Sequence, residues 1–110
     1  MRAVSGGRGG EDGMEKLRGF RARLDELDAR LLEVLAQRFE VCREVAAHKA
    51  EARIPMMQPD RVAEVKQRAV DNGRSRGLAA AFMASLYDLV IAEACRIEDE
   101  ILEAAGESAE

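Results

Sequence analysis

Four cations lie at spacings that suit the binding of a small anion. They are Arg21, Arg38, Lys49 and Arg61. The first three lie in residues 17–52, where apolar residues recur with the period of a helix, and Arg38 falls within the apolar face. Because a guanidinium group forms two parallel hydrogen bonds to a carboxylate, we expect a small dicarboxylate as the ligand.

Each cation also has a simpler explanation when it is taken alone. Arg21 would pair with Asp25 on the surface. Arg38 would be neutralised by Glu98 or by another buried acid, and the other two cations would be ordinary exposed charges. The four together, rather than any one of them, indicate an anion site.

The apolar pattern predicts an all-α chain of three helices, one long and two shorter. The first covers residues 17–52, and a turn with two prolines, residues 54–59, follows it. The second helix is predicted over residues 59–72, with Gly73 as its C-terminal cap. The third is predicted over residues 79–103. The side chains expected inward on these two helices are Val62, Val65, Ala69, Phe82, Leu86, Leu89, Val90, Ala94, Ile97 and Ile101.

The chain of 110 residues suits one domain, which we place at residues 14–104. Residues 1–13 are polar and rich in glycine, and residues 105–110 are polar as well. Both segments have little to bury, so we expect them to be disordered.

Composition excludes several classes of protein. A formal net charge of −4 gives no support to a nucleic-acid partner, and no apolar run is long enough for a membrane. Cys42 and Cys95 lie inside helical patterns, which favours free thiols in a reducing compartment. We expect a cytoplasmic protein. The sequence carries neither a cluster of metal ligands nor a glycine-rich phosphate loop.

The length of the first helix predicts self-association. Its 36 residues span about 54 Å, more than the two following helices of one chain can cover. Two such helices packed antiparallel about a twofold axis would bury the apolar face, whereas the alternative is a monomer with a kinked or partly solvated helix. Arg21 and Arg38 are about 25 Å apart along one helix, so they meet at one ligand only across a dimer.

These residues and their spacing resemble those of the all-helical chorismate mutases. The likeness runs from about Leu17 to Ile101. The residues that carry it are Arg21 with the following Leu27-Asp28, Arg38, Lys49, Pro55 and Arg61. The resemblance implies an intertwined dimer in which the partner supplies Arg21, and an enzyme that needs no metal and no cofactor to rearrange its substrate.

The resemblance also implies a role for each residue. Arg21 and Arg38 would hold the two carboxylates, and Lys49 would hold a carboxylate and the ether oxygen. Arg61 would lie near the ring, and the backbone N–H of Gln58 would face the substituent at C4. Met56 and Met57 would line the apolar side of the substrate; packing within the loop is the alternative.

Glu98 occupies the position where this family carries a Gln or Glu that hydrogen-bonds the ether oxygen. A carboxylate cannot donate to an ether, so Glu98 would have to be protonated. Its alternative role is a salt bridge to Arg38. The reaction is a [3,3] rearrangement, in which the enzyme holds the reactive conformer and cations stabilise charge on the ether oxygen.

One departure from the family bears on the substrate. Ordinary members have Arg-Glu after the proline turn, and that Glu accepts from the C4 hydroxyl, whereas this chain has Arg61-Val62. The turn is most similar to the branch that acts on 4-amino-4-deoxychorismate on the way to antibiotic precursors. Isochorismate-pyruvate lyases also carry Arg-Val here, so chorismate, its 4-amino analogue and isochorismate all remain open. A helical interaction module without activity is the alternative of another class.

Overall fold

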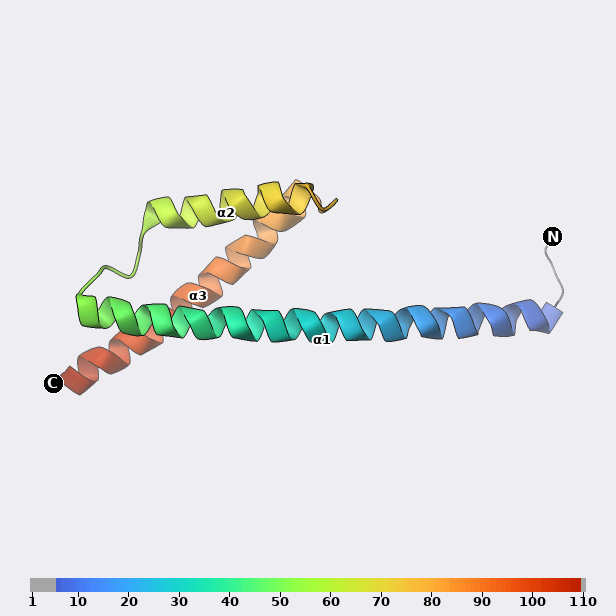
Figure 1. Ribbon diagram of the computed structural model, residues 1–110, viewed down its shortest axis with the longest axis horizontal. Coiled ribbons are helices and arrows are strands. Elements are labelled where there is room, and N and C mark those ends of the chain that lie inside the picture. Colours follow the sequence, from blue (N-terminus) through green and yellow to red (C-terminus); the bar gives the residue numbers. More distant parts are fainter. Residues whose placement is uncertain (1–5, 110) are drawn as a thin grey trace. The chain divides into compact units, whose positions relative to one another are not determined.

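The computed structural model describes residues 6–109, and the side chains of residues 11–106. The described part is all-helical: α1 is Gly6–Ala52, α2 is Pro59–Arg74 and α3 is Ala80–Ala109 (Figure 1). The predicted class and the number of helices are therefore confirmed. Across the described residues, none of the three helices combines the length and the apolar character that a membrane span requires.

The chain divides into two compact units, Met1–Gln37 and Arg38–Glu110. The first unit contains the N-terminal part of α1. Its described side chains, from residue 11 onward, include none that is buried. The large apolar side chains that this unit exposes are Met14, Leu17, Phe20, Leu24, Leu27, Leu31, Leu32 and Val34. A continuous apolar face of this kind is typical of a surface that packs against another chain.

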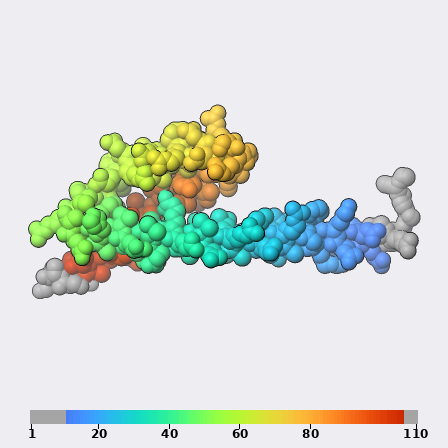
Figure 2. Space-filling view, in the orientation of Figure 1, coloured from blue at the N-terminus to red at the C-terminus, as the bar shows by residue number. Residues whose placement is uncertain are grey.

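The second unit holds the core. Within it α2 packs against α3, as the green-to-yellow and orange atoms of Figure 2 show. The buried apolar residues are Ala46, Ala69, Met83, Val90, Ala94 and Ile97. Four of these were predicted to point inward. Phe82 and Leu89, which were also predicted inward, are 56% and 71% exposed in the single chain.

The end of α2 corrects one prediction. Gly73 does not cap the helix from outside; it lies within α2 and is buried. A Cβ atom there would lie 2.5 Å from Met83 Cγ, so glycine is needed for α2 and α3 to approach each other. The left-handed residue is Gly77, at φ 79°. Leu78 and Gly77 donate to the carbonyls of Gly73 and Arg74, the paired bonds of a Schellman turn.

The C-terminal end of α1 is closed by a similar turn. Arg53 takes the left-handed conformation, with φ 56°, and the Ile54 N–H donates to the Lys49 carbonyl at 2.9 Å. An arginine is unusual in this conformation because its Cβ crowds the following carbonyl. The turn ends α1 shortly before Pro55, which cannot continue a helix, and leads the chain toward Met56.

The helices are longer than predicted. α1 begins at Gly6 rather than Leu17, and α3 ends at Ala109 rather than Glu103. Residues 6–13 and 105–109 are therefore helical in the structure, where disorder was expected. Extending an existing helix needs no new nucleus, which explains how polar and glycine-containing residues join it. Residues 1–5 and 110 lie outside the described part, and the domain limits of 14–104 stay a prediction.

Candidate active site

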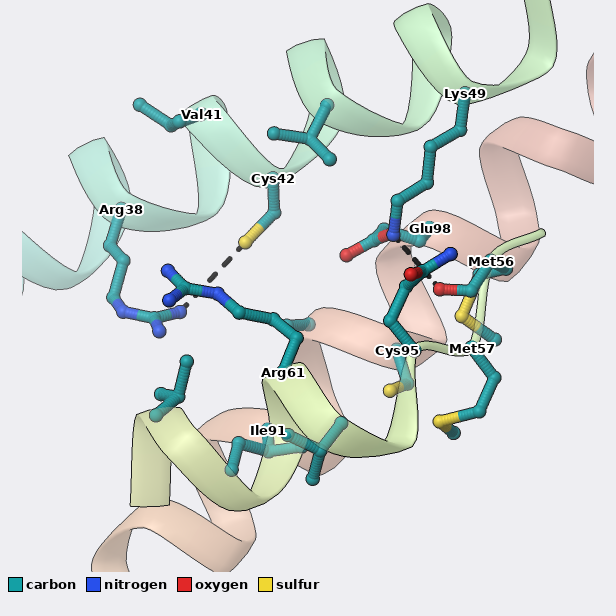
Figure 3. A pocket seen from close by; sticks show the side chains of 15 residues that line it. Arg38, Val41, Cys42, Lys49, Met56, Met57, Arg61, Ile91, Cys95 and Glu98 are labelled. Atoms are coloured by element: carbon teal, nitrogen blue, oxygen red, sulfur yellow. Dashed lines mark hydrogen bonds and ion pairs between the residues drawn. The ribbon is translucent and has the colours of Figure 1, made fainter. Parts of the chain in front are cut away.

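A cavity of about 430 Å³ lies within the unit Arg38–Glu110, bounded by the C-terminal part of α1, the turn before α2, and the helices α2 and α3. The predicted site residues that line it are Arg38, Lys49, Gln58, Arg61, Val62 and Glu98. Figure 3 shows the charged side chains pointing into this space from three different helices. The structure thus brings six of the seven predicted site residues together, and their roles stay predictions.

Lys49 is the most connected of the cations. Its ammonium group donates to Glu98 Oε1 at 3.0 Å and to the carbonyl of Met56 at 2.9 Å (Figure 3). An ammonium group has three hydrogens, so one donor remains for a ligand. The two charged side chains are 16% and 12% exposed, which strengthens their interaction relative to a surface pair. The salt-bridge alternative for Glu98 is therefore realised, but with Lys49 and not with Arg38.

Arg38 is held by neutral groups. Its Nη1 donates to Cys42 Sγ, 3.8 Å away, and its guanidinium carbon lies 5.8 Å from the centre of the Tyr87 ring. Cys42 lies one helical turn further along α1, and Tyr87 belongs to α3. The side chain is half-buried. Its charge faces the cavity, where a carboxylate would be its natural partner.

Arg61 comes from the first turn of α2, as the sequence predicted. Its guanidinium group also faces the cavity, as does that of Arg38 (Figure 3). The side chain is 59% exposed and forms an ion pair with Glu64, which also pairs with Arg68 at 3.4 Å. Arg61 therefore stands at the mouth of the cavity, where it has freedom to turn toward a ligand.

Gln58 and Val62 supply the wall next to the proline turn. The side-chain amide of Gln58 donates to the Pro55 carbonyl at 3.1 Å. Val62 is half-buried in the wall and offers neither a donor nor an acceptor. A substituent on this side of a ligand would meet an amide and an isopropyl group, and no carboxylate from position 62.

Arg21 is the predicted site residue that does not line the cavity. It belongs to the unit Met1–Gln37, and its side chain is exposed. The prediction that a partner chain delivers it is compatible with this exposure but is not tested by a single chain.

The comparison with protein families shows the family of the chain. The model of chorismate mutase type II matches residues 20–99. The chain belongs to the chorismate mutase type II family. It is an isomerase of the chorismate mutase type, as the residue pattern predicted.

Two curated chorismate mutase relatives carry a more specific name. A 4-amino-4-deoxychorismate mutase of Streptomyces pristinaespiralis is 39% identical over 92 residues, which is 84% of this chain and 71% of that protein. A protein of the same name from Streptomyces venezuelae is 39% identical over 95 residues, which is 86% of this chain and 92% of that protein.

Two cysteines that line the cavity were not predicted as site residues. Cys42 and Cys95 are free, half-buried thiols that line it (Figure 3). Burial raises the pKa of Cys42, an effect that the charge of Arg38 opposes, and burial together with the charge of Glu98 raises the pKa of Cys95. Their spacing was the available signal, because Cys42 follows Arg38 by one turn and Cys95 precedes Glu98 by one turn.

The remaining lining of the cavity is apolar. It consists of Val41, Val45, Met56, Met57, Val65, Ile91 and Ala94. Both methionines thus line the cavity, as the resemblance implied. The cations are thus set in a mostly apolar wall, an arrangement that suits a small dicarboxylate with an apolar ring.

Proposed function

We propose that this chain catalyses the [3,3] rearrangement of 4-amino-4-deoxychorismate to 4-amino-4-deoxyprephenate. The observation that carries the proposal is the cavity in which Lys49, paired with Glu98, faces the same space as Arg38. In this cavity Arg38 is able to bind a carboxylate, and Lys49 is able to donate a hydrogen bond to an ether oxygen. A volume of about 430 Å³ suits a ligand of this size.

Binding places the substrate in its compact reactive shape. Arg38 pairs with one carboxylate through its two-pronged guanidinium group, and Arg61 closes over the ring from the mouth of the cavity. The apolar wall around Val41 and Ile91 packs against the carbon skeleton. Holding the two reacting carbons in contact removes much of the entropic barrier of an intramolecular reaction.

The chemical step moves electrons around a six-membered ring of atoms. The ether C–O bond breaks while a new C–C bond forms, and no atom enters or leaves. Negative charge develops on the ether oxygen as its bond to carbon lengthens. The ammonium group of Lys49 donates to that oxygen, and Glu98 does so once it carries a proton in the substrate complex. Both hydrogen bonds lower the barrier.

The preference for the 4-amino substrate rests on the turn before α2. Val62 stands where ordinary members of the family place a Glu that accepts from a C4 hydroxyl. Two relatives that are 39% identical over most of this chain are named for the 4-amino substrate. The C4 substituent then lies against Val62 and Gln58, outside the cluster of cations.

We propose further that the working unit is an antiparallel homodimer with two shared sites. The exposed apolar face of the unit Met1–Gln37 supports this, because side chains such as Leu24, Leu27 and Leu31 are more than half exposed. Burying that face against a second copy stabilises both chains and carries Arg21 toward the partner's cavity.

The direct test is turnover by the purified chain without any added cofactor. Chorismate, 4-amino-4-deoxychorismate and isochorismate are supplied separately, and products are identified by mass spectrometry. We expect consumption of the 4-amino substrate and at least a 100-fold loss in Arg38→Ala. Pyruvate from isochorismate as the main product would favour a lyase, and turnover of none of the three would contradict an enzyme.

A further inference from the structure

Arg38 differs from the other cations of the cavity in how its charge is balanced. Lys49 is paired with Glu98, and Arg61 is paired with Glu64. Within the described residues, Arg38 has no carboxylate at ion-pair distance. Its charge is therefore fully available to a ligand, although nothing charged holds its long side chain in place.

Two neutral groups hold the Arg38 side chain in place. Cys42 accepts a hydrogen bond from one side, and the ring of Tyr87 lies 5.8 Å from the guanidinium carbon. Arg38 and Tyr87 both line a smaller hollow of about 190 Å³, and Arg38 also lines the cavity. A tyrosine ring attracts a cation through its electron-rich face without cancelling the charge.

We infer that Tyr87 is a positioning residue, which holds the Arg38 guanidinium in the orientation that receives a substrate carboxylate. The inference rests on the proposed role of Arg38. An arginine side chain has many conformations in water, and a ring that selects one of them lowers the cost of ordering it when the ligand binds. A carboxylate partner would select a conformation as well, but it would compete with the substrate.

The contact has a spectroscopic signature that needs no substrate. The chain contains one tyrosine, three phenylalanines and no tryptophan. The tyrosine bands of its near-ultraviolet circular dichroism and fluorescence lie at longer wavelength than those of phenylalanine, so these bands report position 87. Arg38→Ala, or Arg38→Met with the apolar stem kept, should change both signals. Arg96→Ala is the matched control, because Arg96 is an exposed arginine of α3 that pairs with Glu93 and Glu100. Superimposable spectra for wild type and both Arg38 variants would overturn the contact.

The kinetic test separates positioning from packing. Tyr87→Leu should raise KM about three- to tenfold and leave kcat within about twofold, because the loss falls on substrate binding. Tyr87→Phe keeps the ring and should restore KM. Leu86→Ala perturbs the neighbouring half-buried position of α3, which lines neither hollow, and should leave KM within about twofold of wild type.

The outcomes distinguish this inference from the proposed function. If Tyr87→Phe raises KM as much as Tyr87→Leu does, the ring is not what holds Arg38, and the inference is overturned. If Leu86→Ala raises KM by the same factor, the effect belongs to packing within α3, and the inference is overturned as well. Wild-type protein that turns over no substrate would refute the proposed function. In that case the spectra of the Arg38 variants still decide whether the contact exists.

Discussion

The ammonium nitrogen of Lys49 lies 3.0 Å from Glu98 Oε1 and 2.9 Å from the carbonyl oxygen of Met56. One side chain thus joins α1 to α3 and to the turn before α2. Because both charged groups are mostly buried, each depends on the other for its electrostatic balance. The same two groups line the cavity, and in the proposed reaction Lys49 directs a hydrogen-bond donor at the ether oxygen.

Lys49→Met should lower the free energy of unfolding by ~1–3 kcal/mol, because it leaves the Glu98 carboxylate without its partner. Denaturation by urea, followed by circular dichroism, measures this change. Turnover should fall at least 100-fold in the same variant, since the cation at the ether oxygen is lost.

The control for that variant removes both charges. Lys49→Met combined with Glu98→Leu should recover part of the lost stability, because no buried charge is left unpaired, yet it should remain inactive. Equal stability of wild type and the single Lys49→Met variant would contradict the view that the pair is energetically coupled.

The proposed step needs a hydrogen-bond donor at position 98, because an ionised carboxylate is not able to donate to the ether oxygen. Glu98→Gln carries an amide that donates without taking up a proton, so its turnover should equal or exceed that of wild type. Asp99→Asn is a matched control on the exposed side of α3 and should keep the wild-type turnover. A Glu98→Gln variant that is much slower than wild type would contradict a donor at this position.

Mixing two inactive variants should restore activity if sites are shared between chains. Arg21→Ala and Arg38→Ala each damage both sites of their own homodimer. After subunit exchange, each mixed dimer has one site with both arginines, so about a quarter of wild-type activity should return. A mixture that stays as inactive as its components would place Arg21 outside the partner's site.

Alkylation of the two cysteines should be slow at neutral pH. Burial raises the pKa of both thiols, so the reactive thiolate of Cys42 or Cys95 forms only at a pH above that of an ordinary thiol. Rates with iodoacetamide, read by mass spectrometry against pH, should therefore rise at higher pH than for the urea-unfolded chain. A bound dicarboxylate product should slow both reactions further, because both thiols line the cavity. Equal alkylation rates in the folded and unfolded chains would contradict the burial of the two thiols.

Much of this site follows from helical spacing. Arg38 and Lys49 lie on one helix, and their positions relative to each other depend on the period of that helix alone. The start of α2 was also predictable, because Pro59 restricts the residue before it and suits the first helical turn. These features depend on the helical period and on the backbone restriction at proline, both of which can be read from the sequence alone.

Features that depend on packing between helices were predicted less well. Gly73 was interpreted as a cap, whereas the close approach of Met83 requires a glycine there, and Gly77 makes the left-handed turn. The salt bridge considered as the alternative role of Glu98 was with Arg38, whereas the structure pairs Glu98 with Lys49. Spacing along each helix does not determine which cation of α1 faces which turn of α3. Tyr87 was not considered as a site residue, although it precedes Glu98 by eleven residues, about three helical turns, and so lies on the same face of α3.

The central claim is that this cavity rearranges the 4-amino substrate in preference to chorismate, and competition between the two measures it most directly. Equal amounts of both compounds are given to the purified chain, and the ratio of kcat/KM values is read from the two prephenate products. We expect at least about a tenfold preference for 4-amino-4-deoxychorismate, and a shift toward chorismate in Val62→Glu, which restores an acceptor for the C4 hydroxyl. Equal values for both substrates, or a preference for chorismate in the wild type, would contradict the account.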